Sequence, residues 1–165
     1  YSSAASDVYK RQASAPVAPT RAGYTFVDWF ATSDLSGTAV SFPYAHGKTT
    51  NFTLYAKWDA NTLNVTFDSN SGTAVTGTTT RTAESIASAP TAPTRAGYTF
   101  DGWYDNPGFN NSQISFPYAH AKTESFTLYA KWSANTLTVS FVSNGGSAVT
   151  AVTTRTAEAL SLIHI

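Results

Sequence analysis

Histidine is the first residue type to weigh, because it can serve both as a metal ligand and as a catalytic base. The chain has three histidines and no cysteine. His46 and His120 occupy the same place in two copies of the segment SFPYAH, and His164 lies near the last residue. A metal site needs three or four converging ligands, which one histidine per copy without a thiolate does not supply. We therefore predict no metal site and no cofactor.

Carboxylates could bind a cation or take part in acid–base chemistry. Those between residues 60 and 133 are Asp68, Glu84, Asp101, Asp105 and Glu124. Asp101 and Asp105 flank a Gly-Trp-Tyr segment and could face the same calcium ion. The other copy has Val27 and Ala31 at these two positions. A calcium site common to both copies is therefore not expected.

Motifs for nucleophilic catalysis and phosphate binding are absent from the sequence. There is no G-x-S-x-G elbow, no G-x-x-x-x-G-K loop and no G-x-G-x-x-G loop. Ten Lys and Arg balance ten Asp and Glu, and only 12% of the residues are charged, so no nucleic-acid partner is implied. The apolar runs are too short for a membrane span. We predict that the chain is not an enzyme and has no catalytic residue.

Aromatic side chains, 14% of the residues, offer the best candidates for a binding surface. Some of them lie on the polar face of a predicted strand, next to a proline, or in a loop that differs between the two copies. The candidate binding residues are Tyr44, Tyr118, Tyr55, Tyr129 and Phe109. Lys57 and Lys131 lie between aromatic residues, and we expect them to be solvated edge lysines that oppose sheet aggregation.

An internal repeat must position all of these residues. The segment APVAPTRAGYTF from Ala15 returns as APTAPTRAGYTF from Ala89, and the same offset then holds without a gap. More than half of the positions in residues 15–88 are identical to those in 89–162. No position is identical between residues 31–40 and 105–114, which contain Gly, Asn, Pro and Ser. The chain is therefore a tandem repeat, and this variable segment is predicted to be a surface loop.

Within one copy, apolar and polar residues alternate with a period of two, which indicates half-buried strands. The pattern is clear over residues 52–58 and 63–67. Residues 68–72 and 143–146 carry the Asn and Gly of tight hairpins. Residues 83–89, closed by Pro90, are the one segment that could form a short helix. We predict a mainly β protein of the α+β class, with one short helix in each unit.

The large apolar residues on the inward faces of these strands are predicted to form the core. A unit of about 70 residues buries little surface, so its aromatic rings must supply much of its stability. The predicted core residues are Trp29, Trp58, Phe67, Tyr98, Phe100, Trp103, Leu128, Trp132 and Phe141.

The ordered series of a hairpin, the segment APTRAGYTFDGWY and the segment FTLYAKW resembles a known family. It is similar to the internalin-type B repeat, also called the Listeria/Bacteroides repeat, of bacterial surface proteins. The residues that carry the resemblance are Asn144, Gly145, Pro93, Gly97, Tyr98, Phe100, Gly102, Trp103, Tyr104, Leu128, Tyr129, Ala130 and Trp132. The first copy departs from the pattern, with Val-Asp-Trp-Phe in place of Asp-Gly-Trp-Tyr. The resemblance implies tandem, compact, β-grasp-like (ubiquitin-like) units.

The family's unit runs from the hairpin to the final Ala-Lys-Trp, which fixes the expected frame. Residues 13–59 are then the back part of one repeat, 60–133 a complete repeat, and 134–160 the front part of another. Residues 1–12 and 161–165 resemble translated sequencing adapters, as found at the ends of environmental gene fragments. We exclude both segments from the fold and expect the chain to be an internal piece of a longer protein.

The resemblance implies a non-catalytic spacer or stalk in an extracellular, cell-surface protein of a bacterium. Its expected partners are the neighbouring repeats of the same chain. Two alternatives stay open. The repeats could form an adhesive module that recognises a host protein or glycan through the variable loop and exposed tyrosines. They could instead be accessory repeats of a secreted hydrolase.

Overall fold

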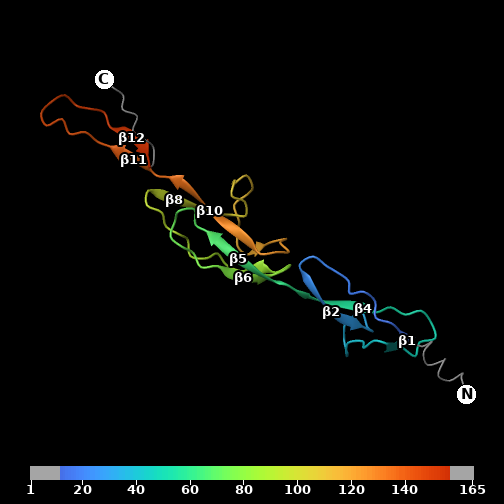
Figure 1. Cartoon of the computed structure of the whole chain (residues 1–165). Coiled ribbons are helices and arrows are strands. Elements are labelled where there is room, and N and C mark those ends of the chain that lie inside the picture. Colours follow the sequence, from blue (N-terminus) through green and yellow to red (C-terminus); the bar gives the residue numbers. More distant parts are fainter. Residues whose placement is uncertain (1–11, 157–165) are drawn as a thin grey trace, which may run out of the picture. The chain divides into compact units, whose positions relative to one another are not determined.

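The computed structural model describes residues 12–156, which fall into two compact units (Figure 1). Unit 1 contains residues 12–62 together with two short segments, 81–83 and 121–124. Unit 2 contains the remaining described residues between 63 and 156. The repeat frame with boundaries at 59/60 and 133/134 stays a prediction. Of the two adapter-like ends, only Gln12 lies within the described residues.

Unit 1 is built on two short antiparallel pairings. The longer one joins β2 (Tyr24–Phe30) to β4 (Tyr55–Ala60), and the shorter one joins β1 (Gln12–Ala13) to β3 (Tyr44–Ala45). Half-buried and exposed residues alternate at the start of β2, as its period-two pattern predicts.

Unit 2 contains a four-stranded sheet in the order β6-β5-β10-β8 (Figure 1). The strands are β5 (Thr62–Asp68), β6 (Thr78–Arg81), β8 (Tyr98–Tyr104) and β10 (Phe126–Ala134). The central pair, β5 and β10, is parallel, whereas β10 and β8 are antiparallel. The strict alternation of buried and exposed residues along β5 shows that one face of this strand covers the core.

The core of unit 2 lies on that face of the sheet. Its buried residues are Val65, Phe67, Ile86, Trp103, Leu128 and Ala130. The rings of Phe67 and Trp103 meet edge to face, with their centroids 4.9 Å apart. Such a pair adds about 0.5–1.5 kcal/mol beyond the burial of its area.

The predicted core residues are found at three levels of exposure. Phe67, Trp103 and Leu128 are buried. The half-buried ones are Trp29, Trp58, Tyr98, Phe100 and Trp132. Phe141 is 50% exposed, so this residue does not lie in a core. Among the described residues, its hairpin has no further neighbouring strand, whereas the equivalent Phe67 lies on β5, which pairs with β10.

A β-bulge interrupts β2 and β8 at the same position of the repeat. The register against β10 shifts between Lys131 and Trp132, opposite Asp101. Gly102 follows with a φ of +133°, a value that favours glycine. The first copy forms the same bulge at Val27 without a glycine. The bulge is therefore a property of the repeat and not of one glycine.

The predicted helix over residues 83–89 is wrong, and with it the α+β assignment, because the described residues contain strands and no helix. Residues 85–86 form β7 (Ser85–Ile86), which pairs with β9 (Tyr118–Ala119). Ala83, the first residue of the predicted helix, has a φ of +63°, which is incompatible with a right-handed helix. A seven-residue segment is also too short to be helical without tertiary support. The β-grasp expectation is not confirmed.

The last described strands are β11 (Thr136–Val139) and β12 (Val152–Arg155), which form an antiparallel hairpin. Only one residue separates β10 from β11, and only one separates β4 from β5. These single residues are Asn135 and Asn61. Residues 59–61 and 133–135, at the predicted repeat boundaries, are thus mostly strand.

Candidate binding surface

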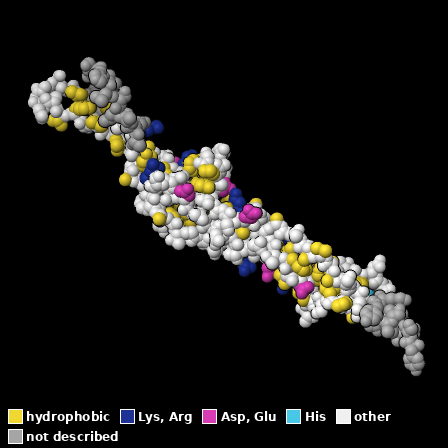
Figure 2. Space-filling model, viewed as in Figure 1, with side chains coloured by type: hydrophobic (Ala, Val, Ile, Leu, Met, Phe, Trp, Pro, Cys, Tyr) yellow, Lys and Arg dark blue, Asp and Glu magenta, His cyan; other side chains and the backbone are white. Residues whose placement is uncertain are grey.

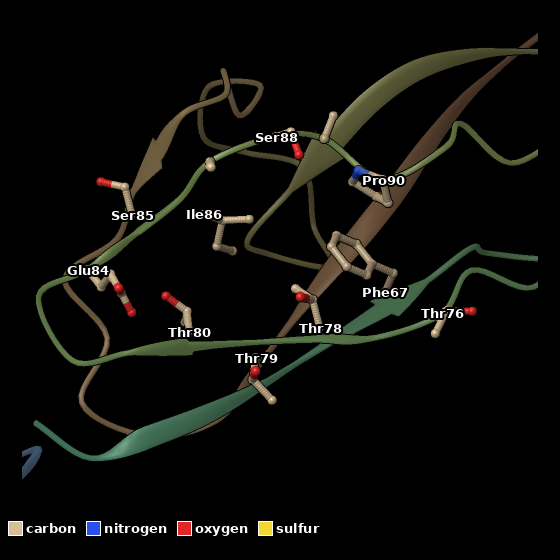
Figure 3. Close-up of a pocket in the computed structure, with 12 residues that line it drawn as sticks. Phe67, Thr76, Thr78, Thr79, Thr80, Glu84, Ser85, Ile86, Ser88 and Pro90 are labelled. Carbon is tan, nitrogen blue, oxygen red and sulfur yellow. The ribbon is translucent and has the colours of Figure 1, made fainter.

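An open groove lies between β6 and residues 84–90 of unit 2 (Figure 3). Its volume is about 420 Å³. The close-up shows Phe67, Ile86 and Thr80 pointing into the space between the two segments, while Thr79 points away. The lining therefore combines an apolar floor with threonine and serine hydroxyls, and Glu84 is its one ionisable residue.

One lining residue of this groove, Thr80, forms a hydroxyl–imidazole pair. The Oγ1 atom of Thr80 and the Nε2 atom of His120 are 3.2 Å apart, and the two residues are 6% and 5% exposed. A nucleophile and its base must meet a substrate, which such burial prevents. The pair instead satisfies two buried polar groups, as interior packing requires.

A second hollow, of about 410 Å³, lies beside the variable loop of unit 2. Its lining comes from four segments: the hairpin turn after β5, the turn before β8, the variable loop, and β10. The lining residues are Asn70, Ser71, Arg95, Pro107, Phe109, Ala130, Lys131 and Trp132. We call this hollow the loop-side hollow.

Hydrogen bonds fix the walls of the loop-side hollow. The indole N–H of Trp132 donates to the carbonyl of Ser69 at 2.9 Å. The side-chain amide of Asn70 donates to the carbonyl of Ala130 at 2.7 Å, and the guanidinium of Arg95 donates to the carbonyl of Asn70 at 3.3 Å. The hairpin turn is thereby held to the end of β10.

Both cations of the loop-side hollow lie over aromatic rings. The guanidinium carbon of Arg95 is 3.8 Å from the ring centre of Tyr98, and the Nζ atom of Lys131 is 5.2 Å from that of Tyr104. Phe109 meets the ring of Tyr104 edge to face at 5.5 Å. Two positive charges beside the half-buried ring of Phe109 can hold an anionic or planar group.

The same cation–aromatic pairs recur in unit 1. Arg21 lies 3.7 Å from the ring centre of Tyr24, and Lys57 lies 5.5 Å from that of Phe30. From the sequence, Lys57 and Lys131 were expected to be solvated lysines, and neither Arg21 nor Arg95 was among the predicted binding residues. The signal that could have found the arginines is the repeated segment Arg-Ala-Gly-Tyr, whose turn brings residues i and i+3 together.

Among the predicted binding residues, Tyr118 is held by a neighbouring carboxylate. Its hydroxyl donates to the Oδ2 atom of Asp105 at 3.2 Å, and the side-chain amide of Asn111 donates to the Oδ1 atom. Burial raises the pKa of Tyr118, and the charge and hydrogen bond of Asp105 raise it further. The phenol is thus kept neutral and in place.

The other predicted binding residues are spread over the two units. Tyr55 is 38% exposed. Tyr44 is half-buried, with the ring of Phe52 6.1 Å away. Tyr129 lies within the sheet of unit 2, opposite Tyr104 in the register. Of the five residues, only Phe109 lines the loop-side hollow.

The two histidines within the described part of the chain lie in aromatic surroundings. The Nδ1 atom of His46 accepts the backbone N–H of Lys48 at 3.0 Å, and its ring is 4.7 Å from that of Phe52. His120 lies 5.0 Å from the equivalent Phe126. Residues 12–156 contain no group of three or more histidines and carboxylates that could hold a metal ion. They also contain no helix long and apolar enough to cross a bilayer.

Comparison with protein families gives one match, in two segments. The model of the Listeria–Bacteroides repeat domain matches residues 3–57 and again residues 64–131. The two matched segments together cover well over half of the chain. The comparison with solved structures found no match.

Three relatives illustrate where such sequences occur. A protein of Evansella cellulosilytica named as a Gly-rich membrane protein is 36% identical over 141 residues, which are 83% of this chain and 15% of the relative. A second membrane protein of that organism is 43% identical over 61% of this chain and 15% of its own length. Internalin H of Listeria monocytogenes is 34% identical over 73% of this chain and 21% of its own length. The chain thus spans about a fifth or less of the relatives it matches.

Proposed function

Because this chain belongs to the Listeria–Bacteroides repeat family, we propose that it is a non-catalytic spacer repeat of an extracellular protein at the bacterial cell envelope. Two matched relatives are named as membrane proteins and one as an internalin, which supports a place at the envelope. As a spacer, the chain would act through the number of its repeats and not through chemistry.

The observation that carries this proposal is the hydrogen bonding of the two single-residue connections. In unit 1, the N–H of Asn61 donates to the carbonyl of Gly23 at 2.9 Å, and the hydroxyl of Thr25 donates to its side-chain oxygen at 2.7 Å. The N–H of Thr82 donates to the carbonyl of Asn61 at 3.1 Å. Asn61 is therefore bonded through three groups.

The same network recurs around Asn135 in unit 2. Its N–H donates to the carbonyl of Gly97 at 2.9 Å, Thr99 donates to its side-chain oxygen at 2.8 Å, and Thr156 donates to its carbonyl at 3.1 Å. Gly97 has a φ of +79°, and a Cβ atom there would collide with the side chain of Thr156. A spacer needs connections that are the same at every repeat and resist fraying, and these networks meet that need.

A length series tests the proposal. Proteins with two, three and four copies of the repeat are compared by small-angle X-ray scattering. A spacer predicts that the maximum dimension grows by a constant amount for each added copy. Replacing the asparagine of every connection by alanine should reduce this increment, because each connection then loses a side-chain hydrogen bond. Dimensions that do not grow with copy number would contradict the spacer function.

A second candidate function, adhesion, is favoured by the loop-side hollow. The hollow joins Phe109 of the variable loop to two cations that both copies carry. Screening the full chain against neutral glycans, sulfated glycans and acidic peptides tests this function. An adhesive module predicts saturable binding that is lost in Phe109→Ala and kept in Leu35→Ala, the equivalent change in the first copy. Absence of saturable binding leaves the spacer function as the better account.

A further inference from the structure

The loop-side hollow of unit 2 contains two positive charges that are not balanced by a negative one. Arg95 and Lys131 line the hollow, and no Asp or Glu is among its described lining residues. Within residues 12–156, neither cation forms an ion pair with a carboxylate. Both cations are therefore available to an anionic group that comes from outside the chain.

The carboxylates on the two strands that pair with β10 are held by neutral donors. Asp68 is the last residue of β5, and it accepts the backbone N–H of Asn70 at 2.9 Å. Asp101 lies in β8, and it accepts the hydroxyl of Ser133 at 2.7 Å. These two hydrogen bonds satisfy the carboxylates without using a cation of the hollow.

The side chains of both cations are positioned by neighbouring groups that carry no charge. The guanidinium of Arg95 donates to the carbonyl of Asn70 and lies over the ring of Tyr98. This bond uses one of its five N–H groups, so the others can still donate. The Nζ atom of Lys131 lies over the ring of Tyr104. Side chains that are already positioned lose less conformational freedom when a ligand binds.

An aromatic ring adjoins these charges. The ring centre of Phe109 is 5.5 Å from that of Tyr104, the ring over which Lys131 lies. Pro107 and Trp132 extend the apolar part of the lining. The hollow thus combines an apolar surface with charged groups, and the carbon atoms of a sugar ring can pack on such a surface.

The size and the polar groups of the hollow also suit a saccharide. Its volume of about 410 Å³ lies within the range of small-molecule sites, which is about 300–1,000 Å³. The hydroxyl of the exposed Ser71 and the side-chain oxygen of Asn70 are in the lining. Hydroxyl and amide groups of this kind can exchange hydrogen bonds with the hydroxyls of a sugar.

An extended peptide fits the hollow less well. Such a peptide binds mainly through hydrogen bonds to the backbone of an exposed strand edge. β10 is an inner strand with neighbours on both sides. The carbonyls of Ser69, Asn70 and Ala130 already accept donors from side chains of the hollow. The hollow therefore offers side chains to a ligand and not a strand edge.

The charge distribution of the chain limits the ligand to a small anionic group. On the face that Figure 2 shows, Lys and Arg lie in small separate groups among Asp and Glu and do not form a continuous basic surface. The whole chain has ten residues of each sign. A long polyanion binds through an extended basic surface, whereas two cations suit a single acidic group.

We propose that the loop-side hollow binds a sugar that carries one acidic group, either a carboxylate or a sulfate ester; this ligand class rests on the adhesion function considered above. Arg95 and Lys131 bind the acidic group, and the sugar ring packs on Phe109. One site per chain is expected, because the first copy has Leu35 in place of this ring.

Nuclear magnetic resonance titration of the isotope-labelled full chain tests the proposal. The probes are methyl glucuronide, the sulfate ester of methyl glucoside, and neutral methyl glucoside, which share one ring and differ in charge. The reporter is the indole N–H of Trp132 in the hollow, and that of the equivalent Trp58 is the internal control. At least one acidic sugar should shift the Trp132 signal saturably and bind about tenfold or more tighter than the glucoside. Equal affinity for all three sugars, or equal shifts of both tryptophans, would overturn the proposal.

Matched variants assign the charge and the ring. Lys131→Gln should weaken binding of the acidic sugar by about tenfold, and Lys57→Gln, the same change in the first copy, should have no effect. Phe109→Leu should weaken binding by about threefold or more, since the ring is lost. Leucine is accommodated here, because Leu35 has nearly the same φ at the equivalent position. Equal affinities of the two lysine variants, or parent affinity in Phe109→Leu, would contradict the assigned contacts.

Two further ligands separate this ligand class from the adhesion function itself. A tetraglutamate peptide and a neutral oligosaccharide are titrated in the same way. If either one shifts the Trp132 signal saturably while both acidic sugars fail, the hollow is a binding site but the proposed ligand class is wrong. If none of the probes shifts the signal, both the ligand class and adhesion through this hollow are refuted.

Discussion

Replacing Leu128 by alanine tests whether the buried face of β10 determines the stability of unit 2. Leu128 is fully buried, lies opposite Phe67 in the register, and contributes to the core of unit 2. Leu→Ala changes at such sites cost about 2–5 kcal/mol, from lost transfer energy and the cavity left behind. We expect about 3–4 kcal/mol for Leu128→Ala, since close neighbours surround the side chain. A unit of this size has a total stability of about 4–11 kcal/mol.

Urea unfolding followed by tryptophan fluorescence measures this loss. Trp29→Phe and Trp58→Phe are introduced together, so that Trp103 and Trp132 report on unit 2 alone. With a slope of about 1 kcal/mol/M, the midpoint should fall by about 3 M. Leu137→Ala is the matched control. This leucine is 49% exposed, so its truncation should shift the midpoint by less than about 0.5 M. Equal shifts for the two leucines would refute the account of the core.

Three further predictions concern backbone geometry, ionisation and domain limits. Gly102→Ala should lower the free energy of unfolding in urea by about 1–3 kcal/mol, because the φ of Gly102 is +133° and a Cβ atom there would collide with the side chain of Gln113. An unchanged urea midpoint would contradict this prediction. The pKa of Tyr118 is raised in the folded state, so the neutral phenol stabilises the fold. This stabilisation is complete below about pH 10 and is lost as the pH rises through the pKa of Tyr118 in the folded state. Unfolding followed against pH should show this alkaline loss, and Asp105→Asn should reduce it; a variant with the parent's profile would count against the Asp105 contact. Residues 60–133 alone should unfold in one cooperative transition in calorimetry. If residues 13–59 alone also folded, the predicted repeat boundaries at 59/60 and 133/134 would be wrong.

The strands were predictable because burial on one face leaves a period of two in the sequence. Trp103 and Leu128 lie on such faces and are buried. The parallel pairing of β5 with β10 was not predictable, since a strand does not encode which distant strand it meets. The prediction of a short helix over residues 83–89 is wrong for a similar reason. Ile86 buries its side chain from a two-residue strand, and this tertiary contact outweighs the weak helical preference of residues 83–89.

The binding surface was less predictable than the fold. Sequence reasoning selected tyrosines by their expected exposure, but Tyr118 is fixed by Asp105 and Tyr129 lies within a sheet. Exposure of a ring depends on neighbours that are distant in sequence. The cation–aromatic pairs, in contrast, depend partly on local geometry. The N–H of Tyr98 donates to the carbonyl of Arg95 at 3.1 Å, and this turn brings the guanidinium over the ring.

The variable loop shows how the two copies can differ in sequence while the loop keeps its length and its backbone turn. No residue is shared between 31–40 and 105–114, yet Leu35 and Phe109 have φ values of 56° and 52° at the same position. Left-handed backbone is unfavourable for such side chains by about 1–3 kcal/mol, so the fold on both sides must impose it. The loop ends are held alike, since Val40 and Ile114 donate to the carbonyls of the equivalent tryptophans at 2.8 and 2.9 Å.

A loop with fixed ends and a fixed turn can change its exposed chemistry at little cost to the core. Phe109 meets Tyr104 beside two cations, whereas the first copy presents Leu35 at this place. Spacer and adhesion functions are therefore compatible within one array, since every repeat keeps its connections while single repeats vary their loops. Exchanging the loops between the copies separates the two functions. The exchange should leave the length per repeat unchanged and move any ligand binding with residues 105–114.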